Sequence, residues 1–423
     1  MDTIFALSSG PPPAAIAVVR ISGPDASAAL CSLTGRLPPP RRAQLARLAD
    51  REGMVLDEAL VLWLPGPATA TGEDSAELHL HGGRAVVAAV ERALAAIPGL
   101  RQARAGEFTR RAFANGRIDL AQAEGLADLL SAETELQRRS AISMAGGAFS
   151  GTVEDWRQRL LELAALVEAA LDFSDEDDVA PLPASFPGKL GQLTGDLRDW
   201  LDRPGAEKLR EGFRVVLAGP PNSGKSTLFN ALVESEAAIT SPLAGTTRDV
   251  IVRPVALDGI PFSFVDTAGL HADPSDMVEA IGIGRAQEEL AEADLVLWLG
   301  PEGEGPDGAW EIEAQCDRDH ASKRHPRHRV SAVTGEGIGA LRADLVAIAS
   351  KAMPRPGVAA LSAHQRHLLA EAWAMLSGAA GEGDLLLVAE SLRSARLAFD
   401  RLTGRAGTED MLDTLFGRFC IGK

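Results

Sequence analysis

An octapeptide in the second half of the chain leaves few folds open to it. The pattern G-x-x-x-x-G-K-[ST] is matched by Gly219-Pro220-Pro221-Asn222-Ser223-Gly224-Lys225-Ser226, with the apolar run RVVLAG before it and a helical run after it. In this context backbone N–H groups converge on phosphates at a helix N-terminus, Lys225 adds charge on the β/γ oxygens, and Ser226 offers a hydroxyl to Mg²⁺. The sequence therefore predicts a P-loop nucleotide site on a parallel sheet.

Two further motifs fit such a site. The apolar run PFSFV is followed by Asp266-Thr267-Ala268-Gly269, so Asp266 falls at the C-terminal end of a strand, where it can hold Mg²⁺ or its water. Gly269 can present its N–H to the γ-phosphate. The intervening loop Gly245-Thr246-Thr247-Arg248-Asp249 supplies Thr247 as a second Mg²⁺ hydroxyl, although this loop by itself is equally consistent with a plain polar connection.

The pattern of apolar residues divides the chain into three domains. Apolar runs between Gly/Pro turns predict strands over the first 115 or so residues, and a three-and-four spacing from Val153 to Val167 predicts a helix. The acidic stretch 172–187 is expected to be a solvated loop, and Asp258-Gly259 predicts a hairpin with one antiparallel edge. Helical patterning resumes after Pro354, so the α/β part is interpreted as an insertion into a helical domain.

The expected fold class is thus α/β plus α, with these boundaries: an N-terminal α+β domain at 1–115, a discontinuous helical domain at 116–208 and 354–423, and the inserted P-loop domain at 209–353.

Composition excludes several classes of protein. The formal charge of −17 argues against coating of nucleic acid by bulk charge, although a local patch can still bind RNA. No run of eighteen apolar residues and no signal-peptide layout occur, so we expect no membrane association and a cytoplasmic location. Cys31, Cys316 and Cys420 are too few and too far apart for a disulfide framework or a zinc site. His79 and His81 share one strand face, but no third metal ligand is evident, which favours packing or a role in a ligand pocket over metal binding.

These motifs resemble the GTPase superfamily, and their details resemble its potassium-stimulated group. Leu270 follows the Asp-x-x-Gly motif where Ras-like enzymes carry a Gln, and Asn222 stands at the family's K⁺-binding position. The family's base-recognition motif N-K-x-D corresponds here to Ala314-Gln315-Cys316-Asp317, in which only the Asp remains. The resemblance therefore implies weakened nucleotide affinity, with the pair Ser331-Ala332 resembling the loop that contacts guanine O6.

The last five residues extend the resemblance. The sequence closes with Phe419-Cys420-Ile421-Gly422-Lys423, and Cys420, close to Arg418 and Lys423, is either a nucleophile or an ordinary tail thiol. An inserted potassium-type GTPase domain, a split helical domain and a C-[ILV]-G-K ending together resemble the MnmE (TrmE) family of bacterial tRNA-modification GTPases. Segments such as TGEDSAELHLHGG and GEFTRRAFANGRIDLAQAEGLADLLSAET match the family in order, so the likeness covers essentially the whole chain.

The resemblance implies the following site residues. Those that contact nucleotide are Asn222, Ser223, Gly224, Lys225, Ser226, Thr227, Ser241, Thr246, Thr247, Asp266, Thr267, Ala268, Gly269, Asp317, Ser331 and Ala332. The K⁺ positions are Asn222, Ser241, Leu243 and Thr246, and the Mg²⁺ ligands are Ser226 and Thr247. The folate contacts are Arg20, Glu77, Arg117 and Lys423, with Arg117 where Lys is common. The catalytic residues are Glu279, which orients water, together with Thr247, Lys225 and Cys420.

The resemblance also implies an activity and its partners. It indicates a GTP hydrolase that dimerises through its N-terminal domain, forms a heterotetramer with the FAD-dependent protein MnmG, and modifies C5 of the wobble uridine of certain tRNAs. Its carbon donor would be 5,10-methylene- or 5-formyl-tetrahydrofolate, and its cofactors Mg²⁺ and K⁺. Two alternatives remain: a regulatory or ribosome-assembly GTPase without modification chemistry, and a folate or tRNA scaffold whose G domain has decayed, as Ala314 and Gln315 suggest.

Overall fold

The computed structural model describes residues 2–172, 182–234, 251–266, 288–318, 323–406 and 409–422. The chain divides into two compact units, one made of Met1–Ala127 with Asp400–Lys423 and the other of Asp128–Phe399. Each unit has its own core, and each is described by itself below.

The first unit contains the predicted N-terminal strands. Its elements are β1 (Thr3–Leu7), β2 (Ile16–Ser22), α1 (Ala26–Thr34), β3 (Gln44–Ala49), β4 (Val55–Leu64), β5 (Ser75–His81), α2 (Arg84–Ala95), β6 (Leu100–Gln102), α3 (Glu107–Ala114), α4 (Leu120–Ser131, as far as Ala127) and α14 (Glu409–Phe416).

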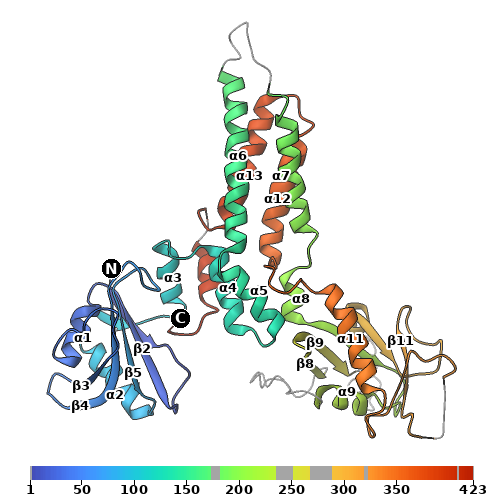
Figure 1. Ribbon diagram of the computed structural model, residues 1–423, viewed down its shortest axis with the longest axis horizontal. Helices are drawn as coiled ribbons and strands as arrows, with labels where there is room; N and C mark the ends of the chain where they lie inside the picture. Colours follow the sequence, from blue (N-terminus) through green and yellow to red (C-terminus); the bar gives the residue numbers. More distant parts are fainter. Residues whose placement is uncertain are drawn as a thin grey trace, which may run out of the picture. The chain divides into compact units, whose positions relative to one another are not determined.

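One sheet organises this unit (Figure 1). Its strands follow the order β3-β4-β5-β2-β1-β6, antiparallel except for the parallel pair β1–β6. Alternate residues of β2, from Ala17 through Val19 to Ile21, are fully buried against α1 and α2, as expected of a half-buried strand with period two. The other face of the sheet is left more open.

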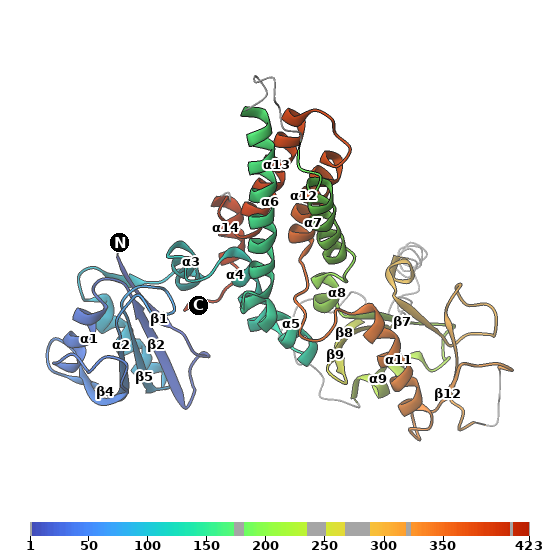
Figure 2. The ribbon, with the colours of Figure 1, turned by 45° about the horizontal axis from the view of Figure 1, so that its top comes forward.

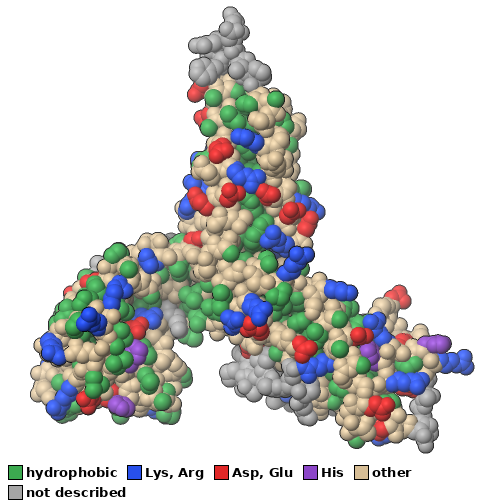
Figure 3. Space-filling view, in the orientation of Figure 1, with side chains coloured by type: hydrophobic (Ala, Val, Ile, Leu, Met, Phe, Trp, Pro, Cys, Tyr) green, Lys and Arg blue, Asp and Glu red, His purple; other side chains and the backbone are tan. Residues whose placement is uncertain are grey.

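The second unit begins with a set of long helices. These are α5 (Glu135–Ala145), α6 (Ala148–Asp172), α7 (Phe186–Leu201), α8 (Ala206–Glu211), α12 (Ala363–Ala379) and α13 (Leu385–Leu402). In both views α6, α7, α12 and α13 lie side by side (Figures 1 and 2). Acidic and basic side chains are interspersed over their outer surface (Figure 3), where for example Arg159 pairs with Asp155 and Asp196.

Aromatic packing fills the interior of these helices. Val153, Trp156, Leu160, Leu163 and Val167 are all buried, which confirms the predicted helix face. Around Trp156, the ring of Trp200 lies edge-on with centroids 6.0 Å apart, and the rings of Phe149 and Phe399 lie at 6.3 and 6.0 Å. The helix ends at Asp172, where the acidic stretch starts; residues 173–181 of that predicted loop lie outside the described residues, and Phe186 already belongs to α7.

The remainder of the second unit is the predicted α/β part. Its elements are β7 (Phe213–Ala218), α9 (Lys225–Glu234), β8 (Ile251–Leu257), β9 (Ile260–Asp266), β10 (Leu295–Trp298), β11 (Trp310–Ala314), β12 (His328–Val330) and α11 (Ile338–Ala352).

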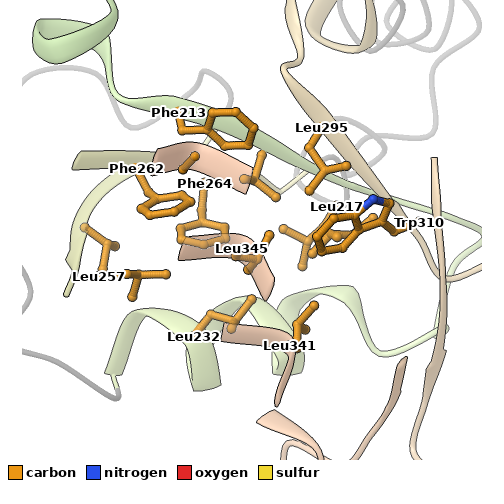
Figure 4. Close-up of a cluster of buried hydrophobic side chains, with 14 of the residues drawn as sticks. Phe213, Leu217, Leu232, Leu257, Phe262, Phe264, Leu295, Trp310, Leu341 and Leu345 are labelled. Carbon is orange, nitrogen blue, oxygen red and sulfur yellow. The ribbon is translucent and has the colours of Figure 1, made fainter. Parts of the chain in front are cut away.

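The order of these strands, β12-β11-β10-β7-β9-β8, is parallel apart from the antiparallel edge β8–β9, as the sequence predicted. Asp258 and Gly259 both have positive φ, 49° and 78°, which is the conformation a two-residue hairpin requires. Phe262 and Phe264 of β9 pack with side chains of the helices α9 and α11, including Leu232 and Leu345 (Figure 4). The whole is a Ras-like α/β arrangement.

The predictions on cysteines and membranes can also be compared with the structure. Cys31, Cys316 and Cys420 are all free thiols. Among the described residues, no helix is both long and apolar enough to cross a membrane.

We predict that replacing Trp156, which is 1% exposed, with Ala destabilises the helical part by about 3–5 kcal/mol, because it removes a large side chain from a closed aromatic cluster. Urea unfolding followed by far-UV circular dichroism measures this. The control is Leu386→Ala on α13, where the side chain is 66% exposed and a change within about 0.5 kcal/mol is expected. Equal effects of the two substitutions would contradict the described packing.

Candidate functional site

The P-loop connects β7 to α9, as predicted. Gly219 has φ 147°, and a Cβ there would lie 2.9 Å from the backbone nitrogen of Gly300, so only glycine fits. Asn222 and Gly224 also have positive φ, 63° and 95°. Three left-handed residues within the loop turn the chain sharply from the strand into the helix, which places the first N–H groups of α9 at the loop's concave side.

Lys225 is buried beneath this loop. Its ammonium donates hydrogen bonds to the carbonyl oxygens of Gly219 and Pro220, each at 2.8 Å. Burial lowers the pKa of Lys225, and the negative charge of Asp266 opposes that effect. The side chain therefore closes the loop on itself and keeps its head at the position where phosphate oxygens would approach.

Asp266 reaches the loop through strand pairing. The parallel register of β7 and β9 sets Leu217 beside Asp266, so the carboxylate lies at the carboxyl end of the sheet, where it is 4% exposed. Ser226, in the first turn of α9, is exposed. A hydroxyl and a carboxylate at one sheet edge are oxygen donors of the kind that Mg²⁺ prefers, so these residues fit the expected ion.

Two adjoining pockets flank the P-loop. One of about 570 Å³ is lined by Asn222, Lys225, Ser226 and Thr227, and suits phosphates. The other, of about 60 Å³, is lined by Leu228, Ala332, Val333 and Asp317 among others.

Asp317, which lines this second pocket, interacts with Ser331. The side-chain hydrogen bond from Ser331 is the main cause that lowers the pKa of Asp317. Ser331 is fully buried, and its hydroxyl also accepts the backbone N–H of Thr334 at 3.2 Å. An ionised carboxylate beside apolar walls can accept hydrogen bonds from a base edge.

The structure thus brings several predicted residues together at the carboxyl ends of the strands. They are Asn222, Ser223, Gly224, Lys225, Ser226, Thr227, Asp266, Asp317, Ser331 and Ala332. The other predicted residues of this site, Ser241, Leu243, Thr246, Thr247, Thr267, Ala268, Gly269 and Glu279, lie outside the described residues, as does Lys423.

A second candidate site lies on the sheet of the first unit. Arg20 on β2 stands directly opposite Glu77 on β5, and its Nε and Nη2 atoms donate to Glu77 Oε1 at 3.1 and 2.9 Å. His79 Nε2 lies 3.3 Å from the other oxygen of Glu77. Arg117, which follows α3, is exposed, and the aliphatic part of its side chain lies next to Gly72 in the loop before β5. The group of Arg20, Glu77 and His79 offers both donors and acceptors on a partly open face.

The segment that carries Cys420 is attached to the same sheet. Ile421 forms an antiparallel bridge with Ala105, and the Ser8 hydroxyl donates to the carbonyl of Gly422 at 2.8 Å. Gly422 has φ 95°, and a Cβ there would lie 2.0 Å from the Leu7 carbonyl oxygen. Gly422 thus contacts Leu7, and Leu7 follows Ala6, which pairs with Arg20. The exposed Cys420 therefore belongs to a segment that is attached one residue along β1 from the strand partner of Arg20.

Sequence reasoning missed two contacts. His79 was assigned no partner, yet it joins the Glu77 group. Arg318 was not singled out, although it lines both pockets beside the P-loop; a basic residue directly after Asp317 was the available signal. Among the described residues, no group of three His, Cys, Asp or Glu side chains is arranged to hold a metal ion.

The P-loop, the parallel sheet with one antiparallel edge and the carboxylate beside them define a P-loop nucleotide-binding protein of the Ras-like class. Comparisons with known proteins refine this. The family described as "MnmE helical domain" matches residues 120–420, and that described as "GTP-binding protein TrmE N-terminus" matches residues 3–117.

Individual relatives agree with those families. The tRNA modification GTPase MnmE of Erythrobacter litoralis is 63% identical over 424 residues, and that of Novosphingobium aromaticivorans is 63% identical over 435 residues, each alignment covering 100% of both chains. Among solved structures, the G domain of the T. maritima FeoB iron transporter is 23% identical with a TM-score of 0.23, covering 32% of this chain and 98% of that one. The full-length relatives, rather than this partial overlap, decide the assignment. The chain belongs to the MnmE family of tRNA modification GTPases.

We predict that Gly422→Ala releases the Cys420 segment from the sheet, because the added methyl group meets the Leu7 carbonyl. Amide hydrogen exchange at 420–422 should then become faster. Gly35→Ala is the matched control, since Gly35 also has positive φ, 75°, but nothing lies within 4 Å of its added Cβ. Unchanged exchange in the Gly422 variant would mean that the segment is held in another way.

Proposed function

We propose that this chain is a potassium-stimulated GTP hydrolase that acts with an FAD-dependent MnmG partner on C5 of the wobble uridine (U34) of certain tRNAs. The product would be the aminomethyl or carboxymethylaminomethyl form, made with a tetrahydrofolate one-carbon unit. The observation that carries the proposal is the P-loop itself, with buried Lys225 under it and Asp266 brought beside it by strand register. The family to which the chain belongs supplies the reaction class.

The described residues have definable roles in hydrolysis. Backbone N–H groups of the loop and of the first turn of α9 would bind the β- and γ-phosphates, and Lys225 would exchange its bonds to the loop carbonyls for bonds to phosphate oxygens. Ser226 and Asp266 would hold Mg²⁺ directly or through water, together with Thr247. Mg²⁺ supplies positive charge that offsets the charge developing on the phosphates.

Potassium would act at the P-loop Asn. Asn222 is exposed, has a positive φ and lines the pocket that contains Lys225 and Ser226. This position suits a side chain that contacts an ion at the rim of that pocket. K⁺ supplies there the charge that an arginine finger supplies in other GTPases. Ser241, Leu243 and Thr246 would complete this site, and Glu279 would orient the attacking water through another group.

The first unit would carry the modification half of the reaction. Arg20, Glu77, Arg117 and Lys423 would bind the folate, and Cys420 would act as a nucleophile from the attached segment. The domain boundaries 1–115, 116–208 with 354–423, and 209–353 are part of the same proposal.

A homodimer through the N-terminal sheet is supported by exposed apolar side chains on its open face. Leu45, Leu60 and Ile16 are 62%, 38% and 59% exposed. Leu45 pairs with Leu60, and Leu60 pairs with His79, so these side chains share one face. A second copy would cover them. We further propose that the enzyme works in the cytoplasm, where its tRNA substrate occurs.

The scaffold alternative rests on Ala314 and Gln315, which replace the Asn and Lys of N-K-x-D. The intact Lys225, Ser226, Thr247, Asp266 and Glu279 oppose it, because they would serve catalysis, whereas the lost Asn and Lys would only recognise the base. The bonds of Lys225 to the loop and the position of Asp266 at the end of β9 support this argument.

We predict that GTP hydrolysis rises roughly tenfold or more when KCl replaces NaCl at equal ionic strength, because a fixed cation at the phosphates stabilises the transition state. We expect no hydrolysis of ATP in either salt. Phosphate release by the purified protein measures this. Lys225→Ala should reduce the rate to background in both salts. Hydrolysis of ATP as well, or no hydrolysis in either salt, would favour the scaffold alternative.

We predict that Cys420→Ser abolishes wobble-uridine modification while GTP hydrolysis stays within about twofold, since the thiol belongs to the first unit and the P-loop to the second. Mass spectrometry of tRNA nucleosides after reaction with MnmG provides the readout. Cys31→Ser is the matched control and should retain both activities. Full modification by the Cys420 variant would show that the thiol is not the nucleophile, and no modification even by the wild-type protein would support the regulatory-GTPase alternative.

A further inference from the structure

Gln315 and Arg318 lie where the two pockets beside the P-loop meet. We call the pocket that contains Lys225 the phosphate pocket and the pocket that contains Asp317 the base pocket. Four residues line both cavities, namely Gly224, Thr227, Gln315 and Arg318. A nucleotide with its phosphates on the P-loop and its base edge at Asp317 must lay its sugar and one face of its base along this shared boundary. The side chains there are therefore placed to contact the nucleoside.

Gln315 is tied to the P-loop. Its φ of 60° turns the chain at the end of β11, and its Nε2 atom donates to the Asn222 carbonyl at a long 3.5 Å. The same atom is 3.2 Å from the position that a Cβ on Gly224 would take. The amide thus lies against the loop, and the residue at this position in N-K-x-D is a lysine.

Arg318 is in turn tied to Gln315. Its Nη1 atom donates to Gln315 Oε1 at 3.0 Å, and its backbone N–H donates to the Gln315 carbonyl at 3.0 Å. The two bonds connect the guanidinium, through a neutral amide, to the P-loop backbone. A guanidinium bound to a neutral acceptor keeps its positive charge available, and its planar face can stack on an aromatic ring.

We propose that Arg318, positioned by Gln315, is the platform on which the purine base of the bound nucleotide stacks. The inference deepens the proposed GTP site and rests on it. In this pair the amide provides the tether to the P-loop and the guanidinium provides the cation.

The platform acts on affinity rather than on the choice of base. Stacking on a cationic plane tolerates any purine, because every base presents a π-face. The choice of base depends on the edge contact at Asp317, whose carboxylate accepts hydrogen bonds but donates none. Loss of the platform should weaken GTP, GDP and ITP by the same factor.

The test is competition of unlabelled GTP, GDP and ITP against a fluorescent guanine nucleotide on the full-length protein. Arg318→Ala should weaken GTP and GDP each by about five- to thirtyfold, the range expected for a desolvated cation–π contact. Gln315→Ala should weaken both as well, and the double variant should be no weaker than Arg318→Ala, because the amide acts through the guanidinium. Adding Gln315→Lys to the Arg318→Ala variant should restore its affinity for GTP and GDP.

Controls separate this inference from the proposed function. Arg324→Ala removes an exposed Arg that lines a different pocket and should leave all affinities unchanged. If the wild-type protein fails to bind GTP or GDP, the proposed function fails. If the wild-type protein binds and Arg318→Ala binds equally well, only the platform is overturned. The same conclusion follows if Arg318→Ala loses affinity for GTP but not for GDP, as loss of a γ-phosphate contact would cause. Strictly additive effects of the two substitutions would overturn the positioning role of Gln315.

Discussion

The parallel hydrogen-bonded ladder between β7 and β9 is the interaction on which the nucleotide site depends. It runs from Phe213 beside Phe262 to Leu217 beside Asp266. Side chains such as Val215, Leu217 and Phe264 are fully buried in one cluster, so the strands are fixed by apolar packing up to the point where the polar residues begin (Figure 4). A change of register by one residue would move Asp266 away from Lys225 and reverse the faces of the strand.

The first unit uses register in the same way. Arg20 meets Glu77 only because β2 and β5 pair antiparallel from Ile16 with His81 to Ser22 with Ser75. The buried alternate residues of β2 hold this pairing, which leaves Arg20 on the more open face. The bridge from Ile421 to Ala105, shortly after β6, and the bond from Ser8, directly after β1, then bring a segment with a thiol from a distant part of the sequence to the same unit. In both units, an apolar core positions polar groups that it does not contain.

The departure at Ala314 and Gln315 affects one part of the nucleotide site and leaves another intact. Near the P-loop, Lys225 and Asp266 are both buried, and Lys225 donates to the loop carbonyls of Gly219 and Pro220. Beside the second pocket, Ser331 forms a hydrogen bond to the Asp317 carboxylate, and Arg318 donates to Gln315, which in turn donates to the Asn222 carbonyl. Loss of a motif in the sequence is therefore not the same as loss of a contact surface.

Local patterns were enough to predict much of this protein. The helix face from Val153 to Val167, the Asp258-Gly259 hairpin and the P-loop each depend on residues close together in sequence, whose spacing and backbone preferences act over a few residues. The partner of Arg318, the His79 contact and the attachment of Gly422 to Leu7 and Ser8 could not be predicted in that way. They join side chains whose meeting depends on strand order, pocket shape and close packing over tens to hundreds of residues, and only the folded chain brings those together.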